Sequence, residues 1–386
     1  MRALLYLCLL LAVGCMGKGN PDAGPATLGA SFQNAESLRQ DGAVLKEIVA
    51  SGPAAQAGLR PDDLILSIGG VPVGGACALE RQLQGWYAGE EVELVVRRGP
   101  ETLQRKVKLA GARDLFEDSC DDGEASGCYL LGTLHAKGLE EERATELFER
   151  ACQVGSAGGS AGACAELALR YLQKDGAAFD AHGFARIACE GGNAAGCSHL
   201  AYVYATGEGV PKSDASALVL YDKACEEGDA NACYNAGLHH EKGRGTRADE
   251  SRALAAYQRA CDLGSSLGCT NLGFLHERGR GVQPDVMRAA IAYRRACEGT
   301  PCEAGDPLGC FNMGVLYRDG MGVKQDKAGA AELFQRSCDR GNAFGCANLA
   351  DLYAAGEGVA EDQEKARELY RRACDGGHED ACTQLR

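Results

Sequence analysis

Cysteines recur along residues 120–382 with a period close to 36. Cys189, Cys225, Cys261 and Cys297 follow one another at intervals of 36 residues. A fixed period of this length predicts a stack of repeated units, and an even set of cysteines at fixed spacing predicts disulfide bonds within the stack. Six pairs are eight residues apart and two are stretched by short insertions; the pairs are Cys120 with Cys128, Cys152 with Cys164, Cys189 with Cys197, Cys225 with Cys233, Cys261 with Cys269, Cys297 with Cys310, Cys338 with Cys346 and Cys374 with Cys382.

The first residues indicate an exported protein. Met1-Arg2 precedes eleven apolar residues, a run too short to span a bilayer as a mature helix. The run ends in Leu11-Ala12-Val13-Gly14-Cys15, which resembles the lipobox of bacterial lipoproteins and implies lipid on Cys15. An ordinary secretory signal with a chance cysteine is the alternative. We expect a signal peptide over residues 1–14, a flexible linker over 15–25 and a lipid-anchored envelope protein, with Met16 indicating the outer membrane, facing the periplasm.

Export explains the number of cysteines, because disulfide bonds persist outside the reducing cytosol. Zinc is the competing explanation, but the sequence has no Cys-x-x-Cys and its histidines lack ligand spacing. We therefore expect neither a metal nor a cofactor. Cys77 and Cys302 fall outside the eight pairs, so they are free, bonded to each other or available to a partner molecule.

The charge balance argues against one class of partner. The formal net charge is −14 and the pI is near 5.1. Binding to nucleic-acid phosphates requires a basic surface, so we expect no nucleic-acid partner.

Residues 26–111 follow a pattern of short strands rather than the later repeat. Gly42 to Val49 alternates loosely, residues 64–68 form an apolar run, and the alternating segments 91–97 and 103–109 flank Gly99-Pro100. Segments like these predict strands and a hairpin, with short helices expected at 54–58 and 76–84. The segment therefore reads as a compact α+β domain.

The same residues resemble the PDZ domains of bacterial periplasmic proteases. The resemblance is carried by Gly42-Ala43-Val44, by the run Ser51 to Leu59 and by the run Asp62 to Gly70. It implies that a peptide adds as an extra strand and that a loop holds a chain terminus with backbone N–H groups. The residues implied are the loop Leu28, Gly29 and Ala30, with Leu79 and Leu83 lining a pocket; the alternative is that these leucines are core.

Residues 112–386 are predicted to form about seven helix hairpins after a first helix that ends at Cys120. In one unit, the segment 231–242 and the segment 249–261 read as two helices, with Asp249 as N-cap. Glycine-rich links such as Gly279-Arg280-Gly281-Val282 join the two helices of most hairpins. Each cysteine pair would join one hairpin to the next.

This pattern resembles Sel1-like repeats, which are relatives of the tetratricopeptide repeat, in their cysteine-rich bacterial subset. The residues that carry it are Asn271-Leu272-Gly273-x-Leu275, Gly279-x-Gly281-Val282 and Ala289 to Cys297. The fold predicted for the chain is thus multidomain: a small α+β PDZ-like domain followed by an all-α superhelical solenoid of disulfide-stapled hairpins.

Relatives in the cysteine-rich subset have been described as penicillin-binding or weakly β-lactam-hydrolysing. A serine β-lactamase would need Ser-x-x-Lys, which does not occur here, nor do Lys-Thr-Gly and Ser-Asp-Asn. His135, His240 and His276 occupy the position of Tyr204, Tyr317 and Tyr353 in other repeats, which indicates packing rather than a metal site. We expect no enzyme activity, and keep β-lactam hydrolysis as the alternative function.

One polar position recurs two residues after the cysteine that opens a hairpin. Amides there could hold an extended peptide along the concave face of the solenoid, because each carries a donor and an acceptor. The alternative is that each amide ties neighbouring helices together. The residues are Asn235, Asn271, Asn312 and Asn348.

Taken together, these features predict a non-catalytic adaptor or scaffold in the bacterial envelope that binds protein or peptide segments through both domains. A purely structural envelope component is a third hypothesis, and it predicts no saturable peptide ligand.

Overall fold

The computed structural model describes residues 26–28, 30–34, 42–153, 160–174, 177–300 and 305–385. The predicted signal peptide, the linker with Cys15, Gly29 and Cys302 lie outside these ranges. Cys77 lies in a described helix, but its side chain is outside the description. The chain divides into two compact units, with the boundary between Gly228 and Asp229.

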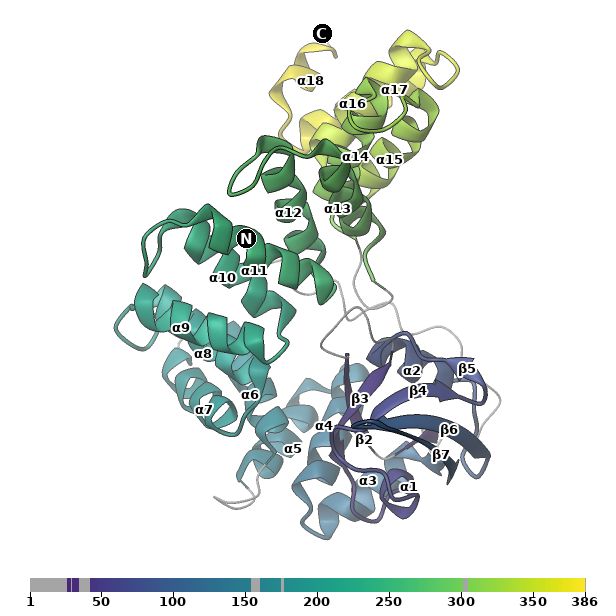
Figure 1. Cartoon of the computed structure of the whole chain (residues 1–386), viewed down its shortest axis with the longest axis vertical. Helices are drawn as coiled ribbons and strands as arrows, with labels where there is room; N and C mark the ends of the chain where they lie inside the picture. Colours follow the sequence, from purple (N-terminus) through teal and green to yellow (C-terminus); the bar gives the residue numbers. More distant parts are fainter. Residues whose placement is uncertain are drawn as a thin grey trace. The chain divides into compact units, whose positions relative to one another are not determined.

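The N-terminal domain is built on an antiparallel sheet in the order β2-β3-β4-β6-β7, with β5 paired to β4 (Figure 1). Strand β2 pairs with β3 from Ala30 opposite Ile48 to Asn34 opposite Ala43. A separate two-stranded ladder joins β1 to β8 just before the first repeat helix. The elements are β1 Ala26–Thr27, β2 Ala30–Asn34, β3 Ala43–Ile48, α1 Pro53–Gln56, β4 Leu64–Ile68, β5 Val71–Pro72, α2 Ala76–Leu83, β6 Glu91–Arg98, β7 Glu101–Lys108 and β8 Ala110–Gly111.

The rest of the described chain is helical. After α3, consecutive helices pair into hairpins from α4/α5 to α16/α17, and α18 follows the last. The described residues thus have the predicted fold class, a small α+β domain followed by a helical solenoid. The helices are α3 Ala112–Asp121, α4 Ala125–Lys137, α5 Glu141–Gln153, α6 Ala161–Gln173, α7 Ala178–Glu190, α8 Ala194–Thr206, α9 Asp214–Glu226, α10 Ala230–Lys242, α11 Glu250–Asp262, α12 Ser266–Arg278, α13 Val286–Glu298, α14 Pro307–Asp319, α15 Lys327–Asp339, α16 Ala343–Ala355, α17 Gln363–Asp375 and α18 Glu379–Thr383.

Local sequence explains where the helices begin and end. Asp249 caps α11 by accepting hydrogen bonds from the backbone N–H groups of Ser251 and Arg252, both at 3.0 Å, as predicted for an N-cap. Gly279 ends α12 in the left-handed region at φ +68°, which glycine adopts without steric penalty. Leu139 takes a similar conformation at φ +64° in one of the hairpins that lacks the glycine link.

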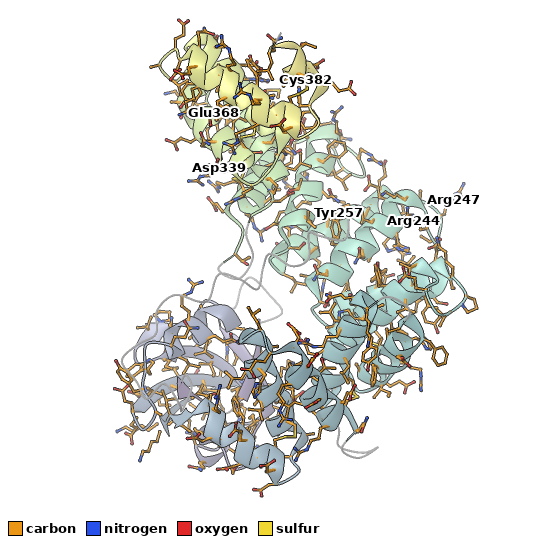
Figure 2. The ribbon with its side chains drawn as sticks, turned by 180° about the vertical axis from the view of Figure 1, so that it is seen from behind. Arg244, Arg247, Tyr257, Asp339, Glu368 and Cys382 are labelled. Carbon is orange, nitrogen blue, oxygen red and sulfur yellow. A yellow bond between two sulfur atoms is a disulfide. The ribbon has the colours of Figure 1, made fainter. Side chains whose placement is uncertain are left out.

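Inside a hairpin, a glycine of the first helix faces an aromatic ring of the second. A Cβ placed on Gly273 would lie 2.5 Å from Cε1 of the fully buried Tyr293. The hydroxyl of Tyr293 donates to Glu277 at 2.7 Å, and the buried Tyr257 donates to Glu241 in the preceding hairpin. Figure 2 shows Tyr257 lying between its helices. The rings therefore fix how closely the paired helices approach.

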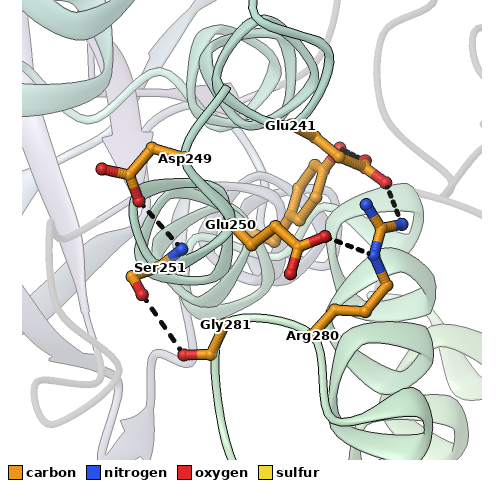
Figure 3. Close-up of polar contacts among 7 residues, drawn as sticks. Glu241, Asp249, Glu250, Ser251, Arg280 and Gly281 are labelled. Carbon is orange, nitrogen blue, oxygen red and sulfur yellow. Dashed lines mark hydrogen bonds and ion pairs between the residues drawn. The ribbon is translucent and has the colours of Figure 1, made fainter. Parts of the chain in front are cut away.

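The glycine links also join successive hairpins. Arg280, in the loop between α12 and α13, donates to Glu250 at 2.8 Å and to Glu241 at 2.7 Å (Figure 3). Gly281 lies so close to the start of α11 that a Cβ there would be 2.5 Å from the Glu250 carbonyl oxygen. The loop of one hairpin therefore packs against the second helix of the hairpin before it.

Candidate peptide-binding site

Strand β2 offers an edge for strand addition. Among the described strands it pairs only with β3, and helix α2 packs beside both. A strand with one unpaired edge presents a row of N–H and C=O groups that a peptide can bind. The arrangement therefore matches what the PDZ resemblance implies for the site.

The predicted pocket residues lie in the core of the sheet domain. Leu28 and Leu79 are fully buried and Leu83 is 5% exposed, and all three belong to one apolar cluster. The carbonyl oxygen of Leu28 accepts a hydrogen bond from the Ala54 N–H at 2.9 Å, and Ala30 is also buried. Trp86, the one tryptophan of the chain, packs against the same cluster and lies close to Gly69.

The four asparagines lie part-buried on the first helices of their hairpins. Asn348 donates to the Phe344 carbonyl at 2.9 Å and accepts from Arg318 at 2.7 Å, so its amide joins α14 to α16. The Asn271 side chain acts to lower the pKa of the Tyr257 hydroxyl, so it lies near this residue of the preceding helix. These contacts favour the helix-tying alternative for Asn348 and Asn271; peptide binding by the four remains a prediction.

The structure places the predicted disulfide bonds at the corners between hairpins. Within the described ranges sixteen cysteines are disulfide-bonded, Cys225 and Cys233 among them. The bonds with described geometry are Cys120–Cys128, Cys152–Cys164, Cys189–Cys197, Cys261–Cys269, Cys297–Cys310, Cys338–Cys346 and Cys374–Cys382.

The first corner has a second role that its spacing did not predict. Cys120 and Cys128 are bonded as predicted, with their Cα atoms 4.4 Å apart. Cys128 is fully buried in an apolar cluster that also contains Val49, the residue that follows β3. Cys128 is therefore also a core residue at the place where the sheet domain meets the repeats, because long-range packing brings Val49 against it.

An arginine two residues before a corner cysteine reaches back to the previous corner, a feature that the sequence analysis missed. Arg295 donates to the Cys261 carbonyl at 2.7 Å and forms an ion pair with Asp262. Arg150 makes the equivalent bond to the Cys120 carbonyl. The repeated Arg-Ala-Cys at 150–152, 295–297 and 372–374 was the available signal.

The sheet domain is joined to the first hairpins within one compact unit. Val49 shares its core cluster with Phe116, Leu131 and Phe148 from α3, α4 and α5. Glu47 at the end of β3 accepts from the Ser160 hydroxyl at 2.7 Å, and Ser160 is the N-cap of α6. The sheet therefore shares both a core and a helix cap with the repeats.

Several glutamate side chains lie near Tyr129 of α4 at this junction. Burial raises the pKa of Glu47, against the opposing effect of hydrogen bonds from Ser160 and Gly162. Burial also raises the pKa of Glu166 on α6, while Arg170 acts to lower it. Burial, together with the negative charges of Glu166, Glu47 and Glu80, raises the pKa of the Tyr129 hydroxyl.

Buried histidines occupy the tyrosine positions that the sequence indicated. His276 is 5% exposed, and burial lowers its pKa. His240 is likewise buried. The backbone carbonyl of each histidine accepts a hydrogen bond from the N–H of the residue that caps the next helix, as the carbonyls of Tyr317 and Tyr353 do. In the described part of the chain, no three His, Cys, Asp or Glu side chains are grouped so that they could hold a metal.

Comparison with known families assigns both parts of the chain. The PDZ domain family matches residues 26–109. The Sel1 repeat family matches residues 125–156, 194–229, 230–265, 266–300, 307–342 and 343–378, which together make up more than half of the chain. The chain belongs to the Sel1 repeat family. One further hairpin, α6/α7, lies between the first two matched segments, so the Sel1 solenoid is continuous from α4 to α9.

Two solved structures resemble the chain. One is a protective antigen present in uropathogenic Escherichia coli strains that displays an SLR fold; it is 29% identical with a TM-score of 0.55, over 62% of this chain and 50% of the antigen. The other is a Sel1 repeat protein from Oxalobacter formigenes, 25% identical with a TM-score of 0.55, over 71% of this chain and 79% of that one. The chain thus spans half the length of the antigen. No curated protein matches it.

None of the described helices combines the length and apolarity that crossing a bilayer would require. The PDZ domain and the Sel1 repeats are both modules for protein interaction, so the domains of this chain are those of an interaction scaffold.

Proposed function

We propose that this chain is a non-catalytic scaffold of the bacterial cell envelope that binds polypeptide segments, with the PDZ domain accepting a strand at β2 and the Sel1 solenoid contacting partners along its first helices. The observation that carries the proposal is the edge of β2 beside α2, which pairs with no other strand in the described part of the chain.

The location follows from the cysteines. Disulfide bonds join sixteen of those that the structure describes, and such a set persists only in an oxidising compartment. A place outside the cytosol also agrees with the predicted signal peptide. Anchoring through lipid on Cys15, and sorting to the outer membrane, complete this proposal.

Binding is tested with the full, oxidised chain and a library of fluorescent decapeptides with free or amidated C-termini. Trp86 adjoins the PDZ core that includes α2, so its emission reports on ligands at that domain. We expect saturable binding of some peptides and a change in Trp86 emission. A library without a single saturable ligand would leave the purely structural role.

The solenoid face is tested separately. Some peptides are expected to bind without changing Trp86 emission, and the double variant Asn271→Ala/Asn312→Ala should lower the affinity for these peptides. The control is Asn231→Ala, at an exposed position of α10. Unchanged affinity of the double variant for every peptide would remove these asparagines from the binding surface.

A further inference from the structure

The start of β2 lies beside the first Sel1 hairpins. Ala30 is opposite Ile48 in the β2/β3 ladder, and Glu47 precedes Ile48. A Cβ placed on Gly162 in the first turn of α6 would lie 2.8 Å from Glu47 Oε1 and 3.1 Å from Tyr129 Cζ. The end of β2 at Ala30 is therefore close to α4 and α6.

Helix α2, on the other side of β2, is held to the same place. Its Glu80 forms an ion pair with Lys137 of α4, with Oε2 and Nζ 3.0 Å apart. Helix α2 and strand β3, which both lie beside β2, are therefore each in contact with a Sel1 helix.

This end of β2 carries an excess of negative charge. The negative charges of Glu47, Glu80 and Glu166 all raise the pKa of the Tyr129 hydroxyl. Lys137 is paired with Glu80, and the Arg170 guanidinium donates to Glu141 and lies over the Phe148 ring. Among the described residues, these two cations are therefore bonded to other groups, although the charge of Arg170 also acts on Glu166.

The charge of Arg170, one helical turn further along α6, acts to lower the pKa of Glu166, but the two side chains form no ion pair. Glu166 follows Gly162 by one helical turn, so it lies on the face of α6 that carries the Glu47 contact. Within the described ranges, its carboxylate has no hydrogen bond or ion pair, although it is largely enclosed by protein. A carboxylate in such a place is stabilised by a cation that supplies the missing hydrogen bonds.

We propose that this junction binds a Lys or Arg side chain of an extended polypeptide segment paired with β2, with Glu166 as its carboxylate partner. The inference rests on the proposed function, because it requires that β2 accept a strand, and it names the partner's chemistry. The unpaired strand edge binds the backbone, and the charge of the junction selects the side chain.

The same charges disfavour a free chain terminus at this end of β2. A terminal carboxylate near Ala30 would face Glu47 and Glu166, and like charges brought together raise the free energy of the complex. The preferred ligand is therefore an internal segment that continues past the end of β2, rather than the chain terminus that the PDZ resemblance implies.

The test uses the full, oxidised chain and a positional-scanning library of decapeptides acetylated and amidated at their ends. We expect wild-type protein to select Lys or Arg at one fixed position, with about ten-fold weaker binding when Gln stands there. Glu166→Gln should abolish this preference and leave binding of the Gln peptide unchanged. Glu368→Gln is the control, since Glu368 is exposed on α17 (Figure 2).

Each outcome decides the matter. Blocked peptides that bind with no basic preference, or a basic preference that survives in Glu166→Gln, overturn the inference but leave strand addition intact. Selection of free C-termini over blocked ends does the same. Failure of every peptide to bind the wild type removes the proposed function and the inference with it. A merely structural Glu166 would change thermal stability in Glu166→Gln without changing which peptide is selected.

Discussion

At the scale of single residues, a few side chains hold one repeat to the next. Arg295 donates to the carbonyl of Cys261 at the end of α11, which also accepts from the Gly264 N–H, and it forms an ion pair with Asp262. The positive charge near a helix C-terminus is favourable for the helix dipole as well. At the corners of Cys152, Cys297 and Cys374, the arginine of Arg-Ala-Cys thus bonds to the carbonyl of the cysteine one corner earlier.

Arg295→Ala should therefore destabilise the protein by about 1 kcal/mol, since it removes a charged hydrogen bond from a partly exposed site. Urea unfolding followed by circular dichroism measures the change. Arg294→Ala is the matched control, because Arg294 is exposed on the same helix. Equal effects of the two substitutions would show that the contact to Cys261 contributes nothing.

His199 should make the protein sensitive to acid. Burial in α8 lowers its pKa from 6.5 to about 4, although a hydrogen bond with the Ala165 backbone opposes the shift. A lowered pKa means that the unfolded chain binds the proton more tightly, so stability is full above pH 6.5 and falls as the pH drops toward 4. The loss approaches about 3 kcal/mol at most.

His199→Gln keeps a donor for Ala165 but removes the titration. Its free energy of unfolding should fall less between pH 7 and pH 4 than that of the wild type, as measured by urea unfolding at each pH. Parallel pH profiles for the two proteins would contradict the assignment.

At the scale of helices and loops, the glycine links have two separate roles. Gly279 ends α12, whereas Gly281, also at positive φ, allows the loop to approach the start of α11. The residue between them pairs with the first residue of the helix it covers: Arg280 with Glu250, and Glu357 with Lys327 in a later hairpin. The two pairs have opposite polarity, so the interaction between loop and helix is kept while its charges are exchanged.

Gly281→Ala should destabilise the protein by about 1–3 kcal/mol, because the new Cβ would overlap the Glu250 backbone. Gly377→Ala separates this effect from backbone strain. Gly377 has φ +90° but nothing within 4 Å of its added Cβ, so only about 1 kcal/mol of conformational strain is expected. Thermal unfolding of both variants measures the difference; a larger effect at Gly377 would contradict the packing role of Gly281.

At the scale of the whole molecule, the PDZ domain and the first Sel1 hairpins share a hydrophobic core within one compact unit. Val49 follows a PDZ strand but is buried among Phe116, Leu131 and Phe148 of the repeats, and Glu47 bonds to the cap of α6. A shared core of this kind prevents the PDZ domain from reorienting freely on a tether. Its peptide edge is consequently held in a fixed relation to α4 and α6.

Val49→Asp should destabilise the PDZ strands and helices α3–α6 together by several kcal/mol, because it buries an unpaired charge in their common core. Hydrogen exchange followed by mass spectrometry would show faster exchange in both regions. Val71→Asp is the control, since Val71 is 54% exposed on β5. Faster exchange confined to the helices would mean that the two parts unfold independently.

Much of this architecture could be predicted from the sequence, because it depends on local and periodic signals. The cysteine period identified the stack, Asp249 and Gly279 marked helix ends, and alternation marked the strands of the PDZ domain. Each of these signals acts through residues close together in the chain, where spacing alone determines which groups can meet.

The contacts that define the candidate site are of another kind. Glu47 and Ser160 are 113 residues apart, and nothing in either segment predicts that a strand end will cap a distant helix. Spacing predicted the disulfide partner of Cys128 but not its burial in one core with Val49. Nor does spacing show that the first turn of α6 lies against Glu47 of β3. Sequence determined the elements and their order, whereas the charge and the boundaries of the binding surface were decided only when long-range packing brought these residues together.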